Sequence, residues 1–442
     1  MNLKNNTDIL ILGGGMVGLT LAHQIAKKYK NLTIKVIDKE KKLGLHNSGR
    51  NSGVLHAGIY YEPNSLKAKV CVEGARRLKE WCLSENLEVL RCGKVIVAQR
   101  SDQSDDLDKL FKRAQKNGAK VEFINKKELM MHSSLIYSAT EKAIWSPNTC
   151  VVDPRSVLKR LSEKLLDLGV IFDFNINKIN LNSKENYIEI FKKGVQEKIS
   201  YGHFFNCCGV HADEIAWKFN ICKNYKILPF KGIYWKLKSN DNYNFRTNIY
   251  PVPDLNVPFL GVHITPNTKG DIFLGPTAIP AFGKENYYGL NGFQPLLSAK
   301  FIQELSSQWI LNKNGFRKYA KEQALQGLKP IFLNSAKQII PSLRNEDLIK
   351  SNKVGIRAQL FDKKERKLVQ DFKLVNYKAS THVLNAISPA FTASFALADL
   401  IIKKSAIEIA TEIQRAEEEA RKKHKLRQKL LSEEKQRKIR EQ

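Results

Sequence analysis

Residues 8–40 read DILILGGGMVGLTLAHQIAKKYKNLTIKVIDKE. An apolar run, a glycine-rich turn, apolar residues at helical spacing and a second apolar run follow one another, which predicts a strand, a turn, a helix and a second strand. Gly13, Gly15 and Gly18 make the pattern G-x-G-x-x-G at the turn. The first glycine permits the turn, the second lets a pyrophosphate approach the backbone, and the third lets helix and strand pack closely. The stretch therefore predicts a dinucleotide-binding α/β unit.

Asp38 ends the second predicted strand, twenty residues beyond Gly18. A carboxylate at this place accepts hydrogen bonds from ribose hydroxyls. It would also repel a 2′-phosphate, so the sequence disfavours NADP. The unpaired N–H groups and the dipole of the first helix are expected to hold the phosphates.

The next stretch, HNSGRNSGVLHAG at residues 46–58, distinguishes between the remaining dinucleotides. It is too rich in Gly and Ser for a helix and too polar for a core strand, so we expect a loop. A nicotinamide enzyme usually continues into repeated βα units here. Small side chains instead permit close approach of a bulky flat ligand, and hydrogen bonds are available from Ser48, Asn51 and Ser52, next to Gly53. The stretch suits a loop beneath a diphosphate and a flavin ring.

Motifs in order along residues 7–404 resemble the L-2-hydroxyglutarate oxidase/dehydrogenase family, which belongs to the D-amino-acid-oxidase-like group of FAD enzymes. They are GGGMVGLTLA, SGRNSGVLHAGIYY, IWSPNTCVVDP, FNCCGVHADEIA, FLGVHIT, GIRAQL and ISPAFTASFALA. The resemblance implies noncovalent FAD and the oxidation of L-2-hydroxyglutarate to 2-oxoglutarate. Two positions depart from the pattern that we expect, Ala390 in place of Gly and Thr277 in place of Asn.

The fold class expected is α/β: a Rossmann-type FAD-binding domain interleaved with a substrate domain of mixed β-sheet plus helices, followed by a charged C-terminal helix. The FAD-binding domain is expected in three segments and the substrate domain in two. The expected FAD-binding segments are 1–88, 151–225 and 344–404, the substrate segments are 89–150 and 226–343, and the tail is 405–442.

Oxidation of a 2-hydroxy acid needs an anchor for a carboxylate and a base for the hydroxyl proton. Arg357, in GIRAQL, is the candidate anchor, because a guanidinium fork matches a carboxylate bidentately. His263 and His56 are the candidate bases, since imidazole titrates near working pH. His263 is preferred because it lies in an apolar strand, where an unpaired polar group is costly. His211 is expected only to lie near the start of a helix.

Two later segments are expected to contact the cofactor. Gly209 would end a strand and face FAD, since its surroundings resemble the family's second FAD segment. The adjacent cysteines, Cys207 and Cys208, are interpreted as small strand residues. A loop before the last helix could stabilise negative charge at the flavin through its backbone N–H groups; its residues are Ser388, Pro389, Ala390, Phe391 and Thr392.

Composition bounds the other function classes. The chain has 442 residues, 43% of them hydrophobic, and a formal net charge of +29. The charge is attributed to a general lysine bias and in part to the tail, and no specific nucleic-acid partner is expected, although a basic tRNA-modifying flavoprotein stays as an alternative. An FAD enzyme acting on glycerol-3-phosphate or an amino acid is another.

The seven cysteines contain no CxxC pair, which argues against a disulfide framework and structural zinc, and no metal site is expected. Without a leader or an apolar run of membrane-spanning length, we expect a cytoplasmic protein. The tail is expected to form a solvated helix or a free polar segment, with a peripheral contact to the membrane face as the alternative. Oxygen, a quinone and a carrier protein are all open as electron acceptors.

Overall fold

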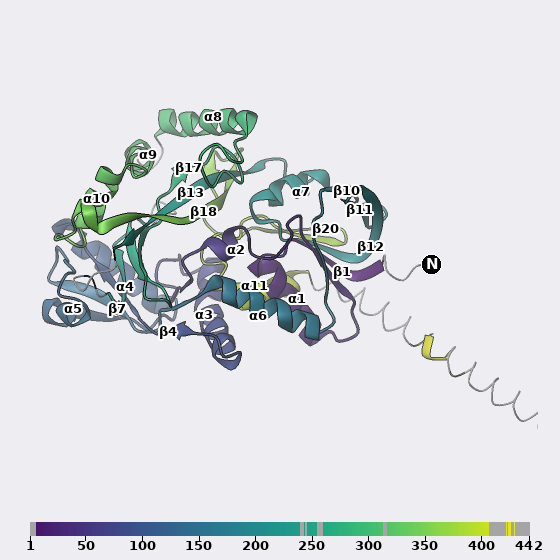
Figure 1. Ribbon diagram of the computed structural model, residues 1–442, viewed down its shortest axis with the longest axis horizontal. Helices are drawn as coiled ribbons and strands as arrows, with labels where there is room; N and C mark the ends of the chain where they lie inside the picture. The colour runs from purple at the N-terminus through teal and green to yellow at the C-terminus, as the bar shows by residue number, and fades with distance from the viewer. Residues whose placement is uncertain are drawn as a thin grey trace, which may run out of the picture.

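The chain folds into two units that lie side by side, each built on its own β-sheet (Figure 1). The computed structural model describes residues 6–238, 243, 245–253, 260–312 and 316–405, and residues 421, 423–425 and 428 of the tail. The expected charged helix of the tail thus lies almost entirely outside the described residues.

The first unit contains the predicted dinucleotide turn. Its eight-stranded sheet has the order β10-β11-β12-β1-β2-β9, and β21 pairs with both β12 and β20. Parallel pairing joins β1 to β2 and to β12, which confirms the Rossmann-type prediction. The strands are β1 (Asn6–Leu12), β2 (Ile34–Ile37), β9 (Ile171–Asp173), β10 (Lys178–Asn182), β11 (Tyr187–Lys192), β12 (Val195–Asn206), β20 (Leu374–Tyr377) and β21 (Ser380–Val383).

Four helices share one apolar core with this sheet. They are α1 (Met16–Lys28), α3 (Leu66–Ser84), α6 (Pro154–Asp167) and α11 (Ser394–Lys404). Two of these helices, α3 and α6, begin at a side-chain cap. Ser65 accepts a hydrogen bond from the Ala68 N–H at 3.1 Å, and Asp153 accepts from the Ser156 N–H at 3.3 Å. Pro154 follows Asp153 at the first helical position, where its missing N–H costs nothing. Residues as far apart in sequence as Ile9 and Ile402 therefore meet in this core.

The second unit is built on a ten-stranded mixed sheet of order β19-β18-β13-β16-β15-β14-β5-β7-β6, with β17 on β13. Apolar clusters fill it beneath α10 and beneath α4. The strands are β5 (Lys94–Val97), β6 (Glu122–Asn125), β7 (Lys142–Ser146), β13 (Tyr225–Leu237), β14 (Asn248–Pro251), β15 (His263–Pro266), β16 (Ile272–Gly275), β17 (Ile279–Pro280), β18 (Leu348–Asp362) and β19 (Lys367–Leu368). The helices outside the first unit's core are α4 (Ser104–Lys116), α5 (Lys126–His132), α7 (Ala212–Lys218), α8 (Pro295–Leu311), α9 (Phe316–Leu325) and α10 (Lys329–Lys337).

A small third sheet, β3-β8-β4, sits at the junction of the two units. Its strands are β3 (Val54–Leu55), β4 (Val89–Leu90) and β8 (Cys150–Val152). The expectation of an irregular loop over residues 46–58 was wrong in part, because Asn47–Arg50 form one helical turn, α2. None of the residues of α2 is buried, so this single turn needs no apolar face, and its polar sequence is compatible with a helix.

The two units are interleaved, but the long strand β18 departs from the expected segments. It pairs with β13 over most of its length, including Arg357 opposite Phe230. It therefore lies in the sheet of the second unit, although the expected segment 344–404 assigns it to the FAD-binding domain. The chain returns to the first sheet only at β20. This strand carries a candidate site residue across the boundary between the units.

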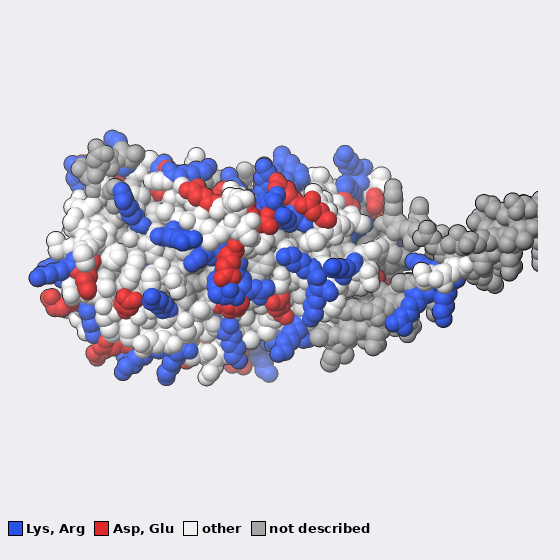
Figure 2. All heavy atoms as spheres, turned by 90° about the horizontal axis from the view of Figure 1, so that it is seen from below, with Lys and Arg blue, Asp and Glu red and all other residues white. Residues whose placement is uncertain are grey.

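On the face of the molecule seen in Figure 2, basic residues are dispersed. Figure 2 shows one face on which Lys and Arg are spread with Asp and Glu among them. Among the described residues, no helix is both long and apolar enough to cross a membrane.

Candidate active site

The glycine-rich turn joins β1 to α1 with its backbone packed against neighbouring backbone. Gly13 has φ +109°, and a Cβ there would lie 2.4 Å from the Cys207 carbonyl oxygen. A Cβ on Gly18 would lie 2.1 Å from the Gly13 carbonyl oxygen. Neither position can carry a side chain without displacing backbone. Gly15 precedes the first residue of α1 and has no side chain to cap the helix, so the start of α1 stays accessible to a phosphate.

Asp38 lies directly beside this turn. One carboxylate oxygen accepts a hydrogen bond from the Gly14 N–H at 2.7 Å, and the other accepts from the Glu40 N–H at 2.9 Å. The backbone thus fixes the carboxylate at the end of β2. Each carboxylate oxygen retains a further lone pair, which can accept from a ribose hydroxyl.

The serine- and asparagine-rich loop packs against the glycine-rich turn and the start of α1. Ser48 Oγ accepts a hydrogen bond from the Met16 N–H at 2.8 Å. Asn51 closes its own loop by donating to the Ser48 carbonyl at 2.8 Å and accepting from the Gly53 N–H at 2.8 Å. Ser52 lines the same cavity as Ser48 and Asn51. Gly53 has φ +78°, and a Cβ there would lie 2.0 Å from the Val152 carbonyl.

The segment before α11 packs against that loop. Thr392 Oγ1 donates to the Val54 carbonyl at 3.0 Å and accepts from the His56 N–H at 3.2 Å. All five residues predicted to contact the cofactor here line one cavity: Ser388, Pro389, Ala390, Phe391 and Thr392. Gly209 adopts φ +54° just after β12, where the 3-10 turn Gly209–His211 begins, and it lies outside this cavity.

The cavity, of about 230 Å³, brings together residues from both units. Met16 and Val17 line it at the start of α1, and His56, His263 and Arg357 line it at the other unit. The predicted anchor and both predicted bases thus face one space together with the predicted flavin segments. The glycines of the turn and Asp38 lie beyond its lining, at the start of α1.

Arg357 reaches the cavity because of strand alternation. Its neighbour Ile356 is 1% exposed and packs in an apolar cluster, so Arg357 projects from the opposite face of β18. Its charge contributes, after burial, to the low pKa values of both His56 and His263. A guanidinium in this position is suited to hold a carboxylate bidentately.

His263 has a defined tautomer. Its Nδ1 lies 3.0 Å from the Gly261 carbonyl oxygen, which can only accept, so Nδ1 carries the proton and Nε2 is left as an acceptor. Burial lowers the pKa of His263 to about 3, so the ring is neutral at physiological pH. The ring stacks on Tyr250 with centroids 4.0 Å apart. The pKa of His263 thus lies well below the value near working pH that the sequence predicts for a base, because burial disfavours the charged ring, while Nε2 of the neutral ring remains an acceptor.

His56 occupies the same cavity from the loop after β3. Burial, followed by the charges of Lys94, His263 and Arg357, holds the pKa of His56 well below its ordinary value. Its buried Nδ1 has no hydrogen-bond partner within the described part of the chain. Buried polar atoms normally have a hydrogen-bond partner, so an unpartnered nitrogen beside a cavity indicates that a polar ligand binds there.

Sequence reasoning missed Tyr250 and Lys94. Tyr250 is fully buried and touches His56, His263 and Tyr60 through ring contacts. The signal for Lys94 was its place in the strand KVIV, all four residues of which are buried. A lysine in such a run is either buried or on an edge strand. Because β5 is an inner strand of the sheet, Lys94 is buried.

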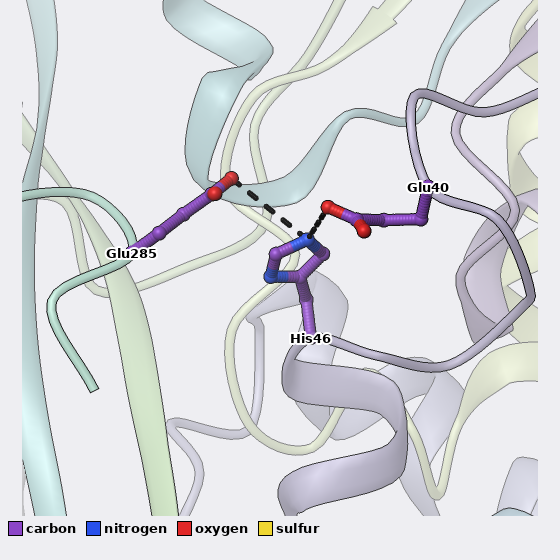
Figure 3. A group of neighbouring side chains, drawn as sticks. All are labelled: Glu40, His46 and Glu285. Carbon is purple, nitrogen blue, oxygen red and sulfur yellow. Dashed lines mark hydrogen bonds and ion pairs between the residues drawn. The ribbon is translucent and has the colours of Figure 1, made fainter. Parts of the chain in front are cut away.

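A charged cluster joins the two units outside the cavity (Figure 3). His46 Nε2 lies 2.9 Å from Glu40 Oε1 and 3.8 Å from Glu285 Oε1. Among the described residues, these three have the spacing of metal ligands. Glu285 also pairs with His211 at 2.8 Å and with Lys39, so its charge is already compensated. We therefore interpret the group as an ion-pair clamp. His211 lies before α7, as expected.

Residues 8–404 match the family described as FAD dependent oxidoreductase. L-2-hydroxyglutarate dehydrogenase, mitochondrial, of Caenorhabditis briggsae is 36% identical over 90% of this chain and 93% of its own length. The Homo sapiens protein of that name is 34% identical over 89% of this chain and 87% of its own. L-2-hydroxyglutarate dehydrogenase of Indibacter alkaliphilus is 34% identical over 88% of this chain and 96% of its own length.

Solved structures share the fold at low identity. L-alpha-glycerophosphate oxidase from Mycoplasma pneumoniae with FAD bound has a TM-score of 0.68 at 18% identity, covering 92% of this chain and 95% of that one. Glycine oxidase from Geobacillus kaustophilus has a TM-score of 0.66 at 14% identity, covering 93% and 95%.

The residues present fit FAD, the cofactor of the matched family. Three glycines leave the backbone bare where α1 begins, Asp38 is held beside them, and one cavity runs from Met16 to the orphaned nitrogen of His56. Sequence and structure agree on one assignment: the chain belongs to the FAD-dependent oxidoreductase family and, within it, to the L-2-hydroxyglutarate dehydrogenases.

Proposed function

We propose that this protein oxidises L-2-hydroxyglutarate to 2-oxoglutarate with FAD. The observation that carries the proposal is the meeting of Arg357, His56 and His263 in one cavity with the loop at residues 48–52 and the segment at residues 388–392. The relatives named L-2-hydroxyglutarate dehydrogenase support the choice of substrate. FAD, when bound, supplies the acceptor for a hydride from the α-carbon.

In this proposal each residue has one task. Arg357 holds the carboxylate next to the reacting carbon and so fixes the orientation of that carbon. His263 Nε2 accepts the hydroxyl proton, because its Nδ1 is committed to the Gly261 carbonyl. His56 faces the same cavity and orients the substrate hydroxyl. The segment before α11 and the loop below it shield the site from water, since Thr392 ties them together.

The direct test is anaerobic mixing of the purified protein with each enantiomer of 2-hydroxyglutarate while the flavin spectrum is recorded. We expect the L enantiomer to bleach the flavin bands and 2-oxoglutarate to accumulate, with the D enantiomer as the matched control. A colourless protein, or a flavin that only glycerol-3-phosphate or an amino acid bleaches, would overturn the proposal. The same reduced protein, mixed in turn with oxygen, a quinone analogue and a carrier flavoprotein, identifies the electron acceptor.

The assignment of the base has its own test. We expect His263→Gln to slow flavin reduction by about 10²- to 10⁴-fold, the usual contribution of general base catalysis, with a smaller effect on substrate affinity. His56→Gln is the matched variant, since it removes the other imidazole of the cavity. If His56→Gln abolishes proton transfer and His263→Gln does not, the two tasks are exchanged. Stopped-flow reduction rates at saturating substrate make the comparison.

A further inference from the structure

Lys94 is a fully buried lysine in the sheet next to the site. It lies on β5, its exposed fraction is 0%, and its Nζ has no hydrogen-bond partner within the part of the chain that the structure describes. The Nζ lies 4.2 Å from the ring centroid of Tyr250 and 5.2 Å from that of Tyr60. Aromatic faces stabilise a cation, but they do not neutralise its charge.

Tyr250 connects Lys94 to the cavity. In the sheet, β14 lies between β5 and β15, so Tyr250 has Lys94 on one neighbouring strand and His263 on the other. The Tyr250 ring stacks on His263, and both line the cavity. The ammonium of Lys94 therefore sits directly behind a wall of the substrate site, where little water screens its field.

No described anion compensates this charge. Burial lowers the pKa of Lys94 to about 7, and the thiols of Cys71 and Cys92 are the neighbours that act to raise it. Burial raises the pKa of each thiol to about 12, so both stay protonated. The other titratable groups around it, Tyr60, Tyr250, His56 and His263, are neutral at pH 7 because burial disfavours their charged forms. A buried cation without a counter-charge is costly unless a ligand supplies one.

The charge of the substrate completes this account, which rests on the proposed function. A 2-hydroxydicarboxylate brings two negative charges into the cavity, and Arg357 compensates one of them. Arg50 also lines the cavity, but its Nε donates to the Leu45 carbonyl at 2.6 Å and its guanidinium lies over the Tyr287 ring at 4.1 Å. We propose that Lys94 is the second cationic group of the substrate site, a positioning residue that stabilises the distal carboxylate of a dicarboxylate from behind Tyr250.

Proton uptake on binding follows from this role. At pH 8 most Lys94 side chains are neutral, since their pKa is about 7. An incoming dianion favours the charged form, so binding draws a proton onto Nζ. The histidines do not contribute at this pH, because their pKa values start far lower. Lys67 is the competing proton acceptor, because burial lowers its pKa to about 7 as well and the charge of Arg357 acts on it, so the Lys94→Met variant decides which lysine takes up the proton. Binding of a dicarboxylate at pH 8 should therefore take up roughly half a proton or more, and binding of a monocarboxylate less.

Titration calorimetry of the FAD-loaded protein with 2-oxoglutarate, in buffers of different ionisation enthalpy at pH 8, measures this uptake. We expect Lys94→Met to abolish the uptake and to weaken 2-oxoglutarate binding about tenfold, while 2-oxobutyrate binding changes little. Lys226→Met is the matched control, because Lys226 is also buried and has a lowered pKa, but the carboxylates of Glu304 and Asp213 lie near it and compensate its charge. It should keep both uptake and affinity.

Two outcomes overturn the role of Lys94. One is wild-type binding without proton uptake, which decides the matter even if the variant fails to fold. The other is a folded, flavin-loaded Lys94→Met protein that takes up protons as the wild type does. In both cases L-2-hydroxyglutarate can still bleach the wild-type flavin, so the proposed function stands. A wild type that neither binds 2-oxoglutarate nor is bleached overturns both.

Discussion

At the scale of the residue, we propose that substrate binding depends on Arg357, the candidate carboxylate anchor. Hydrogen bonds to charged groups contribute about 1.5–3 kcal/mol, so Arg357→Ala should weaken binding of L-2-hydroxyglutarate by about 10- to 100-fold. FAD content should be unchanged, because the dinucleotide turn lies beyond the cavity lining. The measurement is the substrate dependence of anaerobic flavin reduction.

Arg366→Ala is the matched control for this prediction. Arg366 is exposed in the turn that follows β18, outside the cavity lining, and its removal should leave the substrate dependence unchanged. Equal effects of the two substitutions would show that Arg357 is not the carboxylate anchor.

At the scale of the element, we expect the turn between β1 and α1 to determine the affinity for the cofactor. A Cβ on Gly18 would lie 2.1 Å from the Gly13 carbonyl, so Gly18→Ala must displace the backbone that approaches the pyrophosphate. We expect the purified variant to have lost most of its flavin, as read from the ratio of visible to ultraviolet absorbance. Gly327→Ala is the control, since the nearest atom to a Cβ there is 3.7 Å away. Normal flavin content in Gly18→Ala would contradict the turn's role.

The ion-pair clamp between the β2–α2 connection and the segment after β17 makes stability depend on pH. The hydrogen bond from His211, followed by pairing with Lys39, lowers the pKa of Glu285 to about 2 against burial. A depressed pKa adds stability that is complete above about pH 4.5 and is lost as the pH falls towards 2. Urea unfolding should therefore show a lower free energy of unfolding for Glu285→Gln than for the wild type at pH 6. The difference between the two free energies should be smaller at pH 3.

The control for the clamp is Glu346→Gln. Glu346 pairs with Arg344 while its side chain is 63% exposed, so water screens the pair and the substitution should have little effect at either pH. A gap for Glu285→Gln that stays constant from pH 6 to pH 3 would mean that its charge does not stabilise the fold.

Local sequence signals predicted the elements better than their assembly. The strand, the turn at Gly13–Gly18 and the helix after it follow from periodicity and from residues adjacent in sequence. The placement of β18 in the second sheet depends on pairing with β13, more than a hundred residues away, which no local pattern encodes. Lys94 stands in a local pattern of buried strand residues, but its proposed role depends on Tyr250 from a distant strand, which that pattern does not reveal.

At the scale of the whole molecule, the positive charge belongs to the folded body. Residues 406–442 contain 11 Lys and Arg against 8 Asp and Glu, so they carry little of the net charge of +29. The tail does contribute to the excess positive charge, as expected from the sequence, but its share is small. Charge spread in this way favours weak, salt-sensitive contact with polyanions rather than one specific site.

Deletion of residues 406–442 tests this distribution. We expect the shortened protein to keep its flavin content and its reduction by L-2-hydroxyglutarate, because the match to the family ends at residue 404. The salt concentration that elutes it from a cation exchanger should change only slightly. Salt-resistant tRNA binding by the shortened protein would instead favour the tRNA-modifying alternative, and loss of flavin would show that the tail supports the fold.

The path of the chain between the two sheets has a consequence for anyone who would divide this protein. Strands β1 and β2 come from one end of the sequence, β9 to β12 from its middle and β20 and β21 from beyond β18. A gene cut at any single place between residues 90 and 370 would give two fragments, each lacking strands that its own sheet requires. Replacing either half by that of a homologue would therefore exchange strands in both sheets at once.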